Sequence, residues 1–170
     1  MLELFRRYII NKRTRLIYKK NILKKSKNQN DDLFYSIKSF GLKNKNKIFY
    51  VINRSPGGGM FSNLNFVIHH LLIANKFKFI PVIDMQNFIT FYNEKKKINN
   101  SFNSWDYYFE KINNYKLEDI YQSKNVIFTT KNTNNNLFFD GYNKLTSQHK
   151  IIVKRYIKFN KQLIKESNNF

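Results

Sequence analysis

The sequence predicts an α/β fold, a Rossmann-like parallel sheet with flanking helices, from three features of a single stretch. Residues 48–52 form a continuous β-branched and aromatic run, which is typical of a strand buried on both faces. A glycine-rich turn follows at 56–59, and residues 60–75 then show a helical period. Residues 78–84 return to a strand that ends on Asp84. Such a strand–turn–helix–strand unit indicates parallel strands, whose ligands bind at the carboxyl edge of the sheet.

The segment 60–75 is predicted to be a helix with two different faces. At about 100° per residue, seven apolar residues fall on one face. They are Met60, Phe61, Leu64, Val67, Ile68, Leu71 and Leu72. The opposite arc carries polar residues, namely Ser62, Asn63, Asn65, His69 and His70. We therefore expect the apolar face to pack on the sheet.

The glycine turn before this helix is the main candidate site. Unpaired N–H groups and the helix dipole attract anions and polar ligands to a helix N-terminus. Gly57, Gly58, Gly59 and Asn63 are therefore predicted to line a substrate-binding site with no bulky side chain in the way. The turn lacks both the Gly-Lys-Ser/Thr of a Walker loop and the G-x-G-x-x-G of a dinucleotide fingerprint. A plain tight strand-to-helix turn explains the spacing equally well.

An aspartate and a pair of histidines are the other candidates for chemistry. Asp84 ends the second predicted strand near the cleft edge and is the candidate catalytic carboxylate, although a loop-capping role is the favoured alternative. His69 and His70 are adjacent, so on a helix their side chains diverge by about 100° and cannot share a metal as an i, i+4 pair can. No metal site is predicted.

The rest of the chain supplies four more expected elements. The aromatic cluster at 103–110 can stack on sugars, but Tyr107, Tyr108 and Phe109 are predicted to anchor a small helix instead. Residues 117–121 are predicted to form one or two helical turns. Residues 125–129 are predicted to be a third strand. Residues 147–165 are predicted to form one basic amphipathic helix.

Composition limits the range of functions. The 170 residues suit one domain, and 31 Lys and Arg against 11 Asp and Glu give a net charge of +20. This charge fits nucleic acid, a membrane surface or a nucleotide sugar, but heavy use of Lys, Asn, Ile, Phe and Tyr also indicates A/T-rich codons. The chain has no cysteine, which excludes disulfides and thiolate metal sites. No apolar run approaches the roughly 20 residues of a membrane span, so a cytoplasmic location is expected.

Residues 1–46 are predicted to be a basic helical leader and linker that precedes the domain at 47–170. Apolar positions alternate with Arg and Lys between residues 4 and 23. A basic amphipathic helix can lie on an anionic membrane, so peripheral contact with the inner membrane surface is one interpretation. A solvated helix packed on the edge of the domain is the favoured one.

Several segments together resemble the start of the fucosyltransferase-type glycosyltransferases. This group includes α-1,6-fucosyltransferases, nodulation fucosyltransferases and a broad set of bacterial sugar transferases. The matching segments are IFYVI (48–52), the glycine turn, 60–74, IPVID (80–84), FYNE (91–94), NSWDYYFE (103–110), IYQSKNVI (120–127) and YIKFN (156–160). The resemblance therefore covers roughly residues 46–170, and its specificity comes from the order and spacing of the segments.

This resemblance implies a two-domain GT-B-like fold that moves a sugar from a nucleotide donor such as GDP-fucose to a glycan acceptor. It implies inversion at the sugar and no cofactor or required metal. Inverting transfer needs a base for the acceptor hydroxyl and cations for the leaving diphosphate. Gly57, Gly58, Gly59 and Asn63 match the family's glycine loop and its following polar residue.

The chain departs from the family at one motif. In the family a His-x-Arg-x-Gly strand of the second half supplies the pyrophosphate arginine, and no His-x-Arg occurs in these 170 residues. We therefore expect only the N-terminal, acceptor-side half of a truncated or split transferase, inactive alone, with a complementary C-terminal donor-binding half as partner.

Two alternatives to a transferase stay open. A basic nucleic-acid-binding module would need Lys, Arg and aromatic residues gathered on one exposed face. Many aromatic residues here fall in apolar runs predicted as core, which disfavours nucleic acid as a partner. The other alternative is a non-catalytic remnant.

Overall fold

The computed structural model describes residues 37–54, 58–129 and 147–168, all within one compact unit that spans Phe34–Phe170. The leader predicted before residue 37, and Gly57 in the turn, lie outside the described residues. The strands are β1 (Ile37–Lys38), β2 (Lys43–Ile52), β3 (Ile80–Ile83) and β4 (Ser123–Phe128). The helices are α2 (Met60–Lys76), α3 (Trp105–Tyr108), α4 (Leu117–Ile120), α6 (Ser147–Tyr156) and α7 (Lys161–Ser167).

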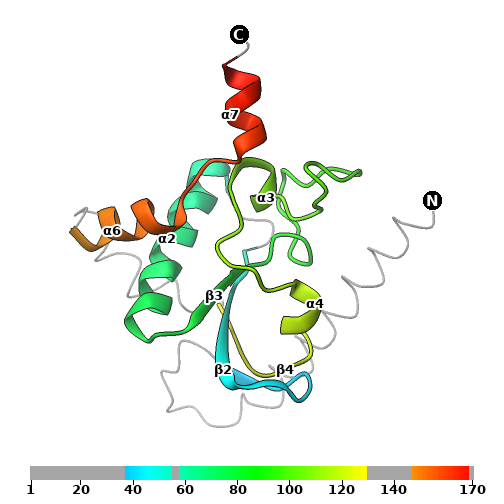
Figure 1. Cartoon of the computed structure of the whole chain (residues 1–170), viewed down its shortest axis with the longest axis vertical. Coiled ribbons are helices and arrows are strands. Elements are labelled where there is room, and N and C mark those ends of the chain that lie inside the picture. Colours follow the sequence, from blue (N-terminus) through cyan, green and yellow to red (C-terminus); the bar gives the residue numbers. More distant parts are fainter. Residues whose placement is uncertain (1–36, 55–57, 130–146, 169–170) are drawn as a thin grey trace. The chain divides into compact units, whose positions relative to one another are not determined.

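The four strands form one sheet in the order β1-β4-β2-β3 (Figure 1). β2 runs parallel to both of its neighbours, with Tyr50 opposite Pro81 on one side and Ile127 on the other. Pro81, which has no N–H to donate, lies in β3, where only one side needs a full ladder. β1 adds an antiparallel edge to β4. The predicted α/β fold with a parallel sheet and flanking helices is confirmed.

β2 is the centre of this sheet, and its last four residues have no exposed surface. Successive side chains of a strand point to opposite faces. Tyr50 faces α2, where its hydroxyl lies 2.7 Å from Nδ1 of His70. Phe49 faces the other side, where its ring meets Tyr115 edge-on at 5.0 Å. The sheet is therefore covered on both faces, by α2 and by the segment that leads into α4, as the run of apolar residues predicted.

The sheet begins earlier in the chain than predicted. β1 and the first four residues of β2 lie before residue 47, so this part of the predicted helical linker is strand. Lysines and asparagines fill residues 43–47, and no apolar period marks them as strand. Their pairing comes from distant residues, since Lys43 N–H donates to Gln122 O at 3.0 Å.

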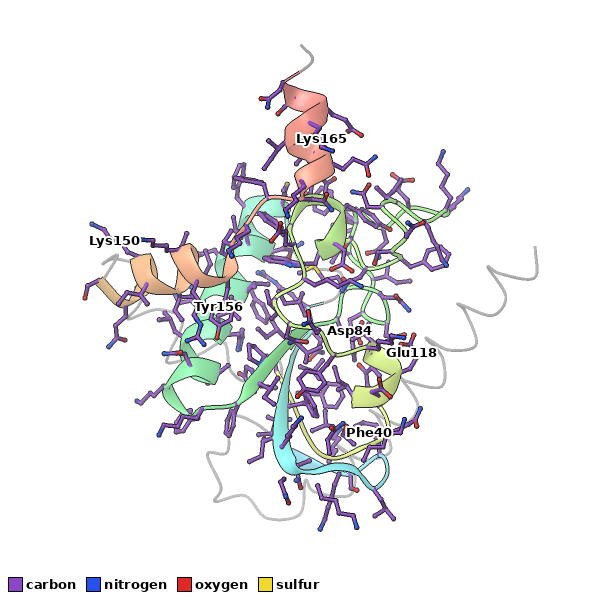
Figure 2. The ribbon with its side chains drawn as sticks, in the orientation of Figure 1. Phe40, Asp84, Glu118, Lys150, Tyr156 and Lys165 are labelled. Carbon is purple, nitrogen blue, oxygen red and sulfur yellow. The ribbon has the colours of Figure 1, made fainter. Side chains whose placement is uncertain are left out.

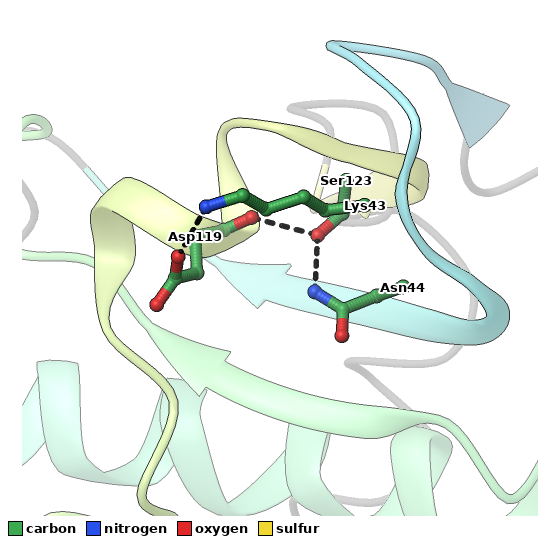
Figure 3. Close-up of polar contacts among 4 residues, drawn as sticks. All are labelled: Lys43, Asn44, Asp119 and Ser123. Atoms are coloured by element: carbon green, nitrogen blue, oxygen red, sulfur yellow. Dashed lines mark hydrogen bonds and ion pairs between the residues drawn. The ribbon is translucent and has the colours of Figure 1, made fainter.

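Polar side chains hold this beginning of β2 to the α4–β4 turn (Figure 3). The buried Ser123 hydroxyl donates to the Asp119 carbonyl at 2.8 Å and accepts from Nδ2 of Asn44 at 2.9 Å. Lys43 forms an exposed ion pair with Asp119 at 2.9 Å, which also lowers the pKa of that carboxyl. An exposed pair of this kind contributes at most about 1 kcal/mol, so the hydrogen bonds of Ser123 are the main tie.

The predicted helix at 60–75 is confirmed, but its orientation differs from the prediction. The residues with little exposed surface are Asn63, Phe66, Val67, His70, Leu71 and Ala74, spaced as one helical face. Phe61, predicted to pack on the sheet, is 80% exposed, whereas His70, predicted on the polar arc, has no exposed surface. α6 also contacts α2 (Figure 1), which explains why apolar residues surround most of this helix.

The single helix predicted at 147–165 is two helices. α6 ends at Tyr156, and α7 begins at Lys161 after an extended link in which Phe159 bridges to Phe109. Asn160 caps α7, because its side chain accepts from the Gln162 N–H at 2.9 Å. Within the described part of the chain, no helix has both the length and the apolar composition that a membrane crossing requires.

Candidate functional site

The candidate site lies at the carboxyl edge of the sheet, where β2, β3 and β4 end together. The sheet's hydrogen bonding continues past the strands, since Asp84 N–H donates to Ile52 O at 3.1 Å and Thr129 N–H to Val51 O at 3.0 Å. The Thr129 hydroxyl accepts from Asn53 N–H at 3.0 Å. This edge is therefore rigid up to the point where the glycine turn leaves β2.

The glycine turn presents the start of α2 without side-chain caps. Gly59 is the N-cap residue, no side-chain cap bond is formed among the described residues, and the first turn holds no acidic residue. Gly59 is exposed, and a Cβ placed on it would meet only the Tyr92 hydroxyl, at 3.7 Å. The N–H groups of a first helical turn have no partner within the helix and carry the positive end of its dipole. This turn can therefore receive an oxygen-rich or anionic group.

Asn63 supplies the most informative atom of the site. Its side chain is 5% exposed, and Nδ2 donates to the Gly58 carbonyl at 3.3 Å. That bond fixes which end of the amide is the nitrogen, because a carbonyl oxygen only accepts. The other end, Oδ1, is buried and has no hydrogen-bond partner among the residues that the structure describes. Leaving a buried acceptor unpaired costs about 1–3 kcal/mol, so this oxygen is suited to a donor that the protein itself does not provide.

Arg54 places a cation at the same turn. Its guanidinium lies 5.0 Å from the centre of the Phe66 ring, and Nη1 donates to the Ser62 carbonyl at 2.9 Å. This bond uses one of the five N–H groups of a guanidinium. Arg54, the start of α2 and Asn63 Oδ1 therefore combine positive charge with one unsatisfied acceptor.

Asp84 is fully buried at the end of β3 (Figure 2). Its carboxylate accepts from the N–H groups of Gln86 and Asn87 at 3.2 and 2.8 Å, from Asn87 Nδ2 at 2.9 Å, and from the Tyr121 hydroxyl. Burial raises the pKa of Asp84, and these hydrogen bonds act against the rise. Burial and the nearby Asp84 also raise the pKa of Tyr121 well above its usual value. These contacts agree with the loop-capping role rather than with direct contact to a substrate.

The histidines near α2 serve packing. His70 bonds to Tyr50, and burial lowers its pKa from 6.5 to about 3. His69 Nδ1 lies 2.8 Å from the Asn65 carbonyl, and the His69 ring meets His149 of α6 edge-on at 5.4 Å. Within residues 37–54, 58–129 and 147–168, no three His, Cys, Asp or Glu residues cluster as metal ligands would.

The structure thus brings together Gly58, Gly59 and Asn63 but places Asp84 in the interior, away from exposed surface. Sequence reasoning missed Arg54 and Tyr92. Arg54 directly follows the buried strand, a position at the ligand edge of a parallel sheet that could have marked it. Tyr92 is 33 residues from Gly59 in the chain, and only the folded loop brings its hydroxyl there.

Comparisons of this chain with protein-family models, with curated proteins and with solved structures gave no match.

Proposed function

We propose that this chain is the N-terminal, acceptor-side half of a fucosyltransferase-type glycosyltransferase with a GT-B-like fold. The carboxyl edge of its parallel sheet would form one wall of the cleft between two Rossmann-like halves. The observation that carries the proposal is the buried, unpartnered Oδ1 of Asn63 beside the open start of α2. The segments that resemble the family support it, and they include this turn.

The chemistry of the turn suits a sugar nucleotide or a glycan better than a bare phosphate. The N–H groups of the first helical turn and Arg54 are donors, whereas Asn63 Oδ1 is an acceptor. A phosphate satisfies donors only, but a sugar hydroxyl both donates and accepts. A ligand with hydroxyl groups next to an anionic group would therefore satisfy both the donors and the acceptor of this turn.

The proposed transfer needs groups from outside these residues. Deprotonation of an acceptor hydroxyl requires a base that reaches it, and the buried Asp84 carboxylate does not meet this need. The leaving diphosphate requires cations, which the family draws from a His-x-Arg-x-Gly strand that these 170 residues lack. The proposal therefore includes a complementary half that holds the donor.

Calorimetric titration with GDP-fucose tests this proposal. The chain alone should bind weakly or not at all, and a second chain that carries a His-x-Arg-x-Gly strand should produce clear binding in the mixture. Tight binding by the chain alone would contradict the inference that these residues lack the donor site. Absence of binding in both settings would contradict the proposed function.

The variant Asn63→Leu assigns that binding to the turn. It removes the unpartnered oxygen and the 3.3 Å bond of Nδ2 to the Gly58 carbonyl at similar volume, so the two effects on thermal stability oppose each other and we expect little net change together with loss of binding in the mixture. Asn65→Leu, the same change two residues further along α2, is the matched control and should bind normally. A clear loss of stability in Asn63→Leu, with binding intact, would show that Asn63 serves the fold alone.

A further inference from the structure

A pocket of about 760 Å³ lies among three segments: the loop at 92–99, the nearby α3, and α7, which is more than 50 residues further along the chain. This volume is in the range of small-molecule sites. The lining residues are Tyr92, Glu94, Lys96, Lys97, Ile98, Asn99, Tyr107, Tyr108, Gln162, Leu163 and Glu166.

The loop that forms one wall of the pocket is held in shape. Asn99 and Asn100 adopt φ of 49° and 59°, a left-handed conformation that Asn tolerates better than most residues. Ile98 and Ser101 exchange backbone hydrogen bonds at 3.0 and 2.9 Å around this turn. Asn99 Nδ2 also donates to the Tyr107 carbonyl of α3 at 3.4 Å. The wall therefore exists before any ligand arrives.

Asn160 joins the remaining two walls. Its backbone N–H donates to the Tyr108 carbonyl at 2.9 Å, and its Nδ2 donates to the Asp106 carbonyl at 3.0 Å, both in α3. Its Oδ1 accepts from the Gln162 N–H of α7. Side-chain and backbone bonds of this one residue thus fix α7 against α3.

The charges of the lining balance, which is unusual in a chain with a net charge of +20. Glu94 and Glu166 contribute two negative charges, and Lys96 and Lys97 contribute two positive ones, so the formal sum is zero. A pocket selected for phosphate or nucleic acid would keep an excess of positive charge. The balance therefore favours an uncharged ligand.

The other lining groups suit an uncharged ligand that is rich in hydroxyls. Tyr92 and Tyr108, which are only partly buried, offer apolar ring surface with a polar tip, and Asn99 and Gln162 offer amides that both donate and accept. Pyranose rings have the same mixed character, with C–H faces and hydroxyl edges. Apolar ring surface together with paired donors and acceptors is thus complementary to a carbohydrate.

Tyr92 connects this pocket to the glycine turn. It lines the pocket, and its hydroxyl lies next to Gly59, 3.7 Å from where a Cβ would stand. We propose that the pocket binds a short neutral oligosaccharide whose end reaches the turn past Tyr92. Carbohydrate binding stands by itself, whereas the identity of this ligand as the sugar acceptor rests on the proposed transferase function.

Saturation-transfer NMR on the full chain tests the pocket, with diacetylchitobiose, lactose, maltose and mannobiose as probes. We expect at least one of them to bind. The variant Lys96→Ala/Lys97→Ala/Gln162→Ala should weaken that binding about tenfold or more, because it removes several hydrogen-bond donors. Lys95→Ala/Lys165→Ala changes the net charge equally at neighbouring residues outside the lining and should bind as the wild type does.

The outcomes separate this inference from the proposed function. No binding of any probe, or equal binding by the pocket variant and its control, would overturn the pocket as a carbohydrate site. Competition of inorganic phosphate with the bound disaccharide would also overturn it, since an anion would then be the ligand. If the pocket binds sugar while the GDP-fucose titrations fail, the inference holds and the proposed transferase function does not.

Discussion

His70 shows how a single residue of α2 ties stability to pH. It has no exposed surface, and burial, with smaller contributions from His69 and Arg54, lowers its pKa from 6.5 to about 3. Its bond to the Tyr50 hydroxyl at 2.7 Å joins α2 to the central strand. The neutral imidazole is therefore the form that the folded chain contains at neutral pH.

We predict that unfolding becomes easier below pH 6.5. The unfolded chain gains a proton on this histidine near pH 6.5, whereas the folded chain resists protonation down to about pH 3. The stabilisation is thus complete above pH 6.5 and is lost at about 1.4 kcal/mol per pH unit, or about 2 kcal/mol by pH 5. Urea unfolding at both pH values measures it.

The variant His70→Gln isolates this contribution. Burial also lowers the pKa of His149, so this group too loses stability as the pH falls. Burial raises the pKa of Asp84 and Asp106, so these two groups add stability as the pH falls. These groups remain in the variant, so the difference between the two pH profiles belongs to His70. Gln keeps an acceptor for Tyr50. Parallel profiles would contradict the assignment.

At the scale of elements, α2 shows what the sequence could and could not reveal. Its existence and limits follow from the helical period and the glycine turn, and the helix ends at Lys76, one residue later than predicted. The sequence did not show which face of α2 is buried, because apolar residues occur on nearly every side of the helix. In addition, two polar residues, Asn63 and His70, are buried. Their burial depends on Tyr50 and on the turn, which are partners that a helical period does not contain.

The break between α6 and α7 was hidden for a similar reason. The apolar stripe of residues 152, 156, 159 and 163 continues through it, and no Gly or Pro marks an interruption. The break depends on contacts with distant residues, since Glu110 N–H donates to the Lys158 carbonyl at 2.8 Å and the Phe109 and Phe159 rings stack at 5.5 Å. Asn160 is the one local signal, as a preferred N-cap residue.

We predict that Asn160→Ala loosens α7 without unfolding the sheet. α7 has no buried residue, so its position depends on its cap and on the bonds of Asn160 to α3. Loss of a cap costs about 1 kcal/mol, which corresponds to roughly fivefold faster hydrogen exchange of the amides in residues 161–167. Mass spectrometry of exchanged peptides measures it. Lys165→Ala is the control in the same helix, and an equal acceleration throughout β2 and β4 would show a global effect instead.

At the scale of the whole molecule, the aromatic residues divide between the core and scattered exposed positions on α2, at Phe91 and at Phe159. Eight aromatic residues belong to the buried core, namely Phe49, Tyr50, Phe66, Phe88, Trp105, Tyr107, Phe109 and Phe128. Phe61 and Phe77 are exposed at opposite ends of α2, about 24 Å apart at 1.5 Å per residue. Stacking of successive bases needs aromatic rings gathered along one basic groove. The two exposed rings of α2 are too far apart for this, which favours codon bias over a nucleic-acid groove as the source of the +20 charge.

The charge alone should still attract RNA, and that attraction has a recognisable salt dependence. We predict weak retention of single-stranded RNA on filters at low salt and loss of it by about 0.2 M, because exposed lysines contribute only counterion release. Phe61→Ala and Phe77→Ala should leave this binding unchanged, since we expect neither ring to stack on an RNA base. Binding that survives 0.2 M salt and falls severalfold in either variant would identify an aromatic RNA platform on α2, and the glycosyltransferase proposal would then lose to the nucleic-acid alternative.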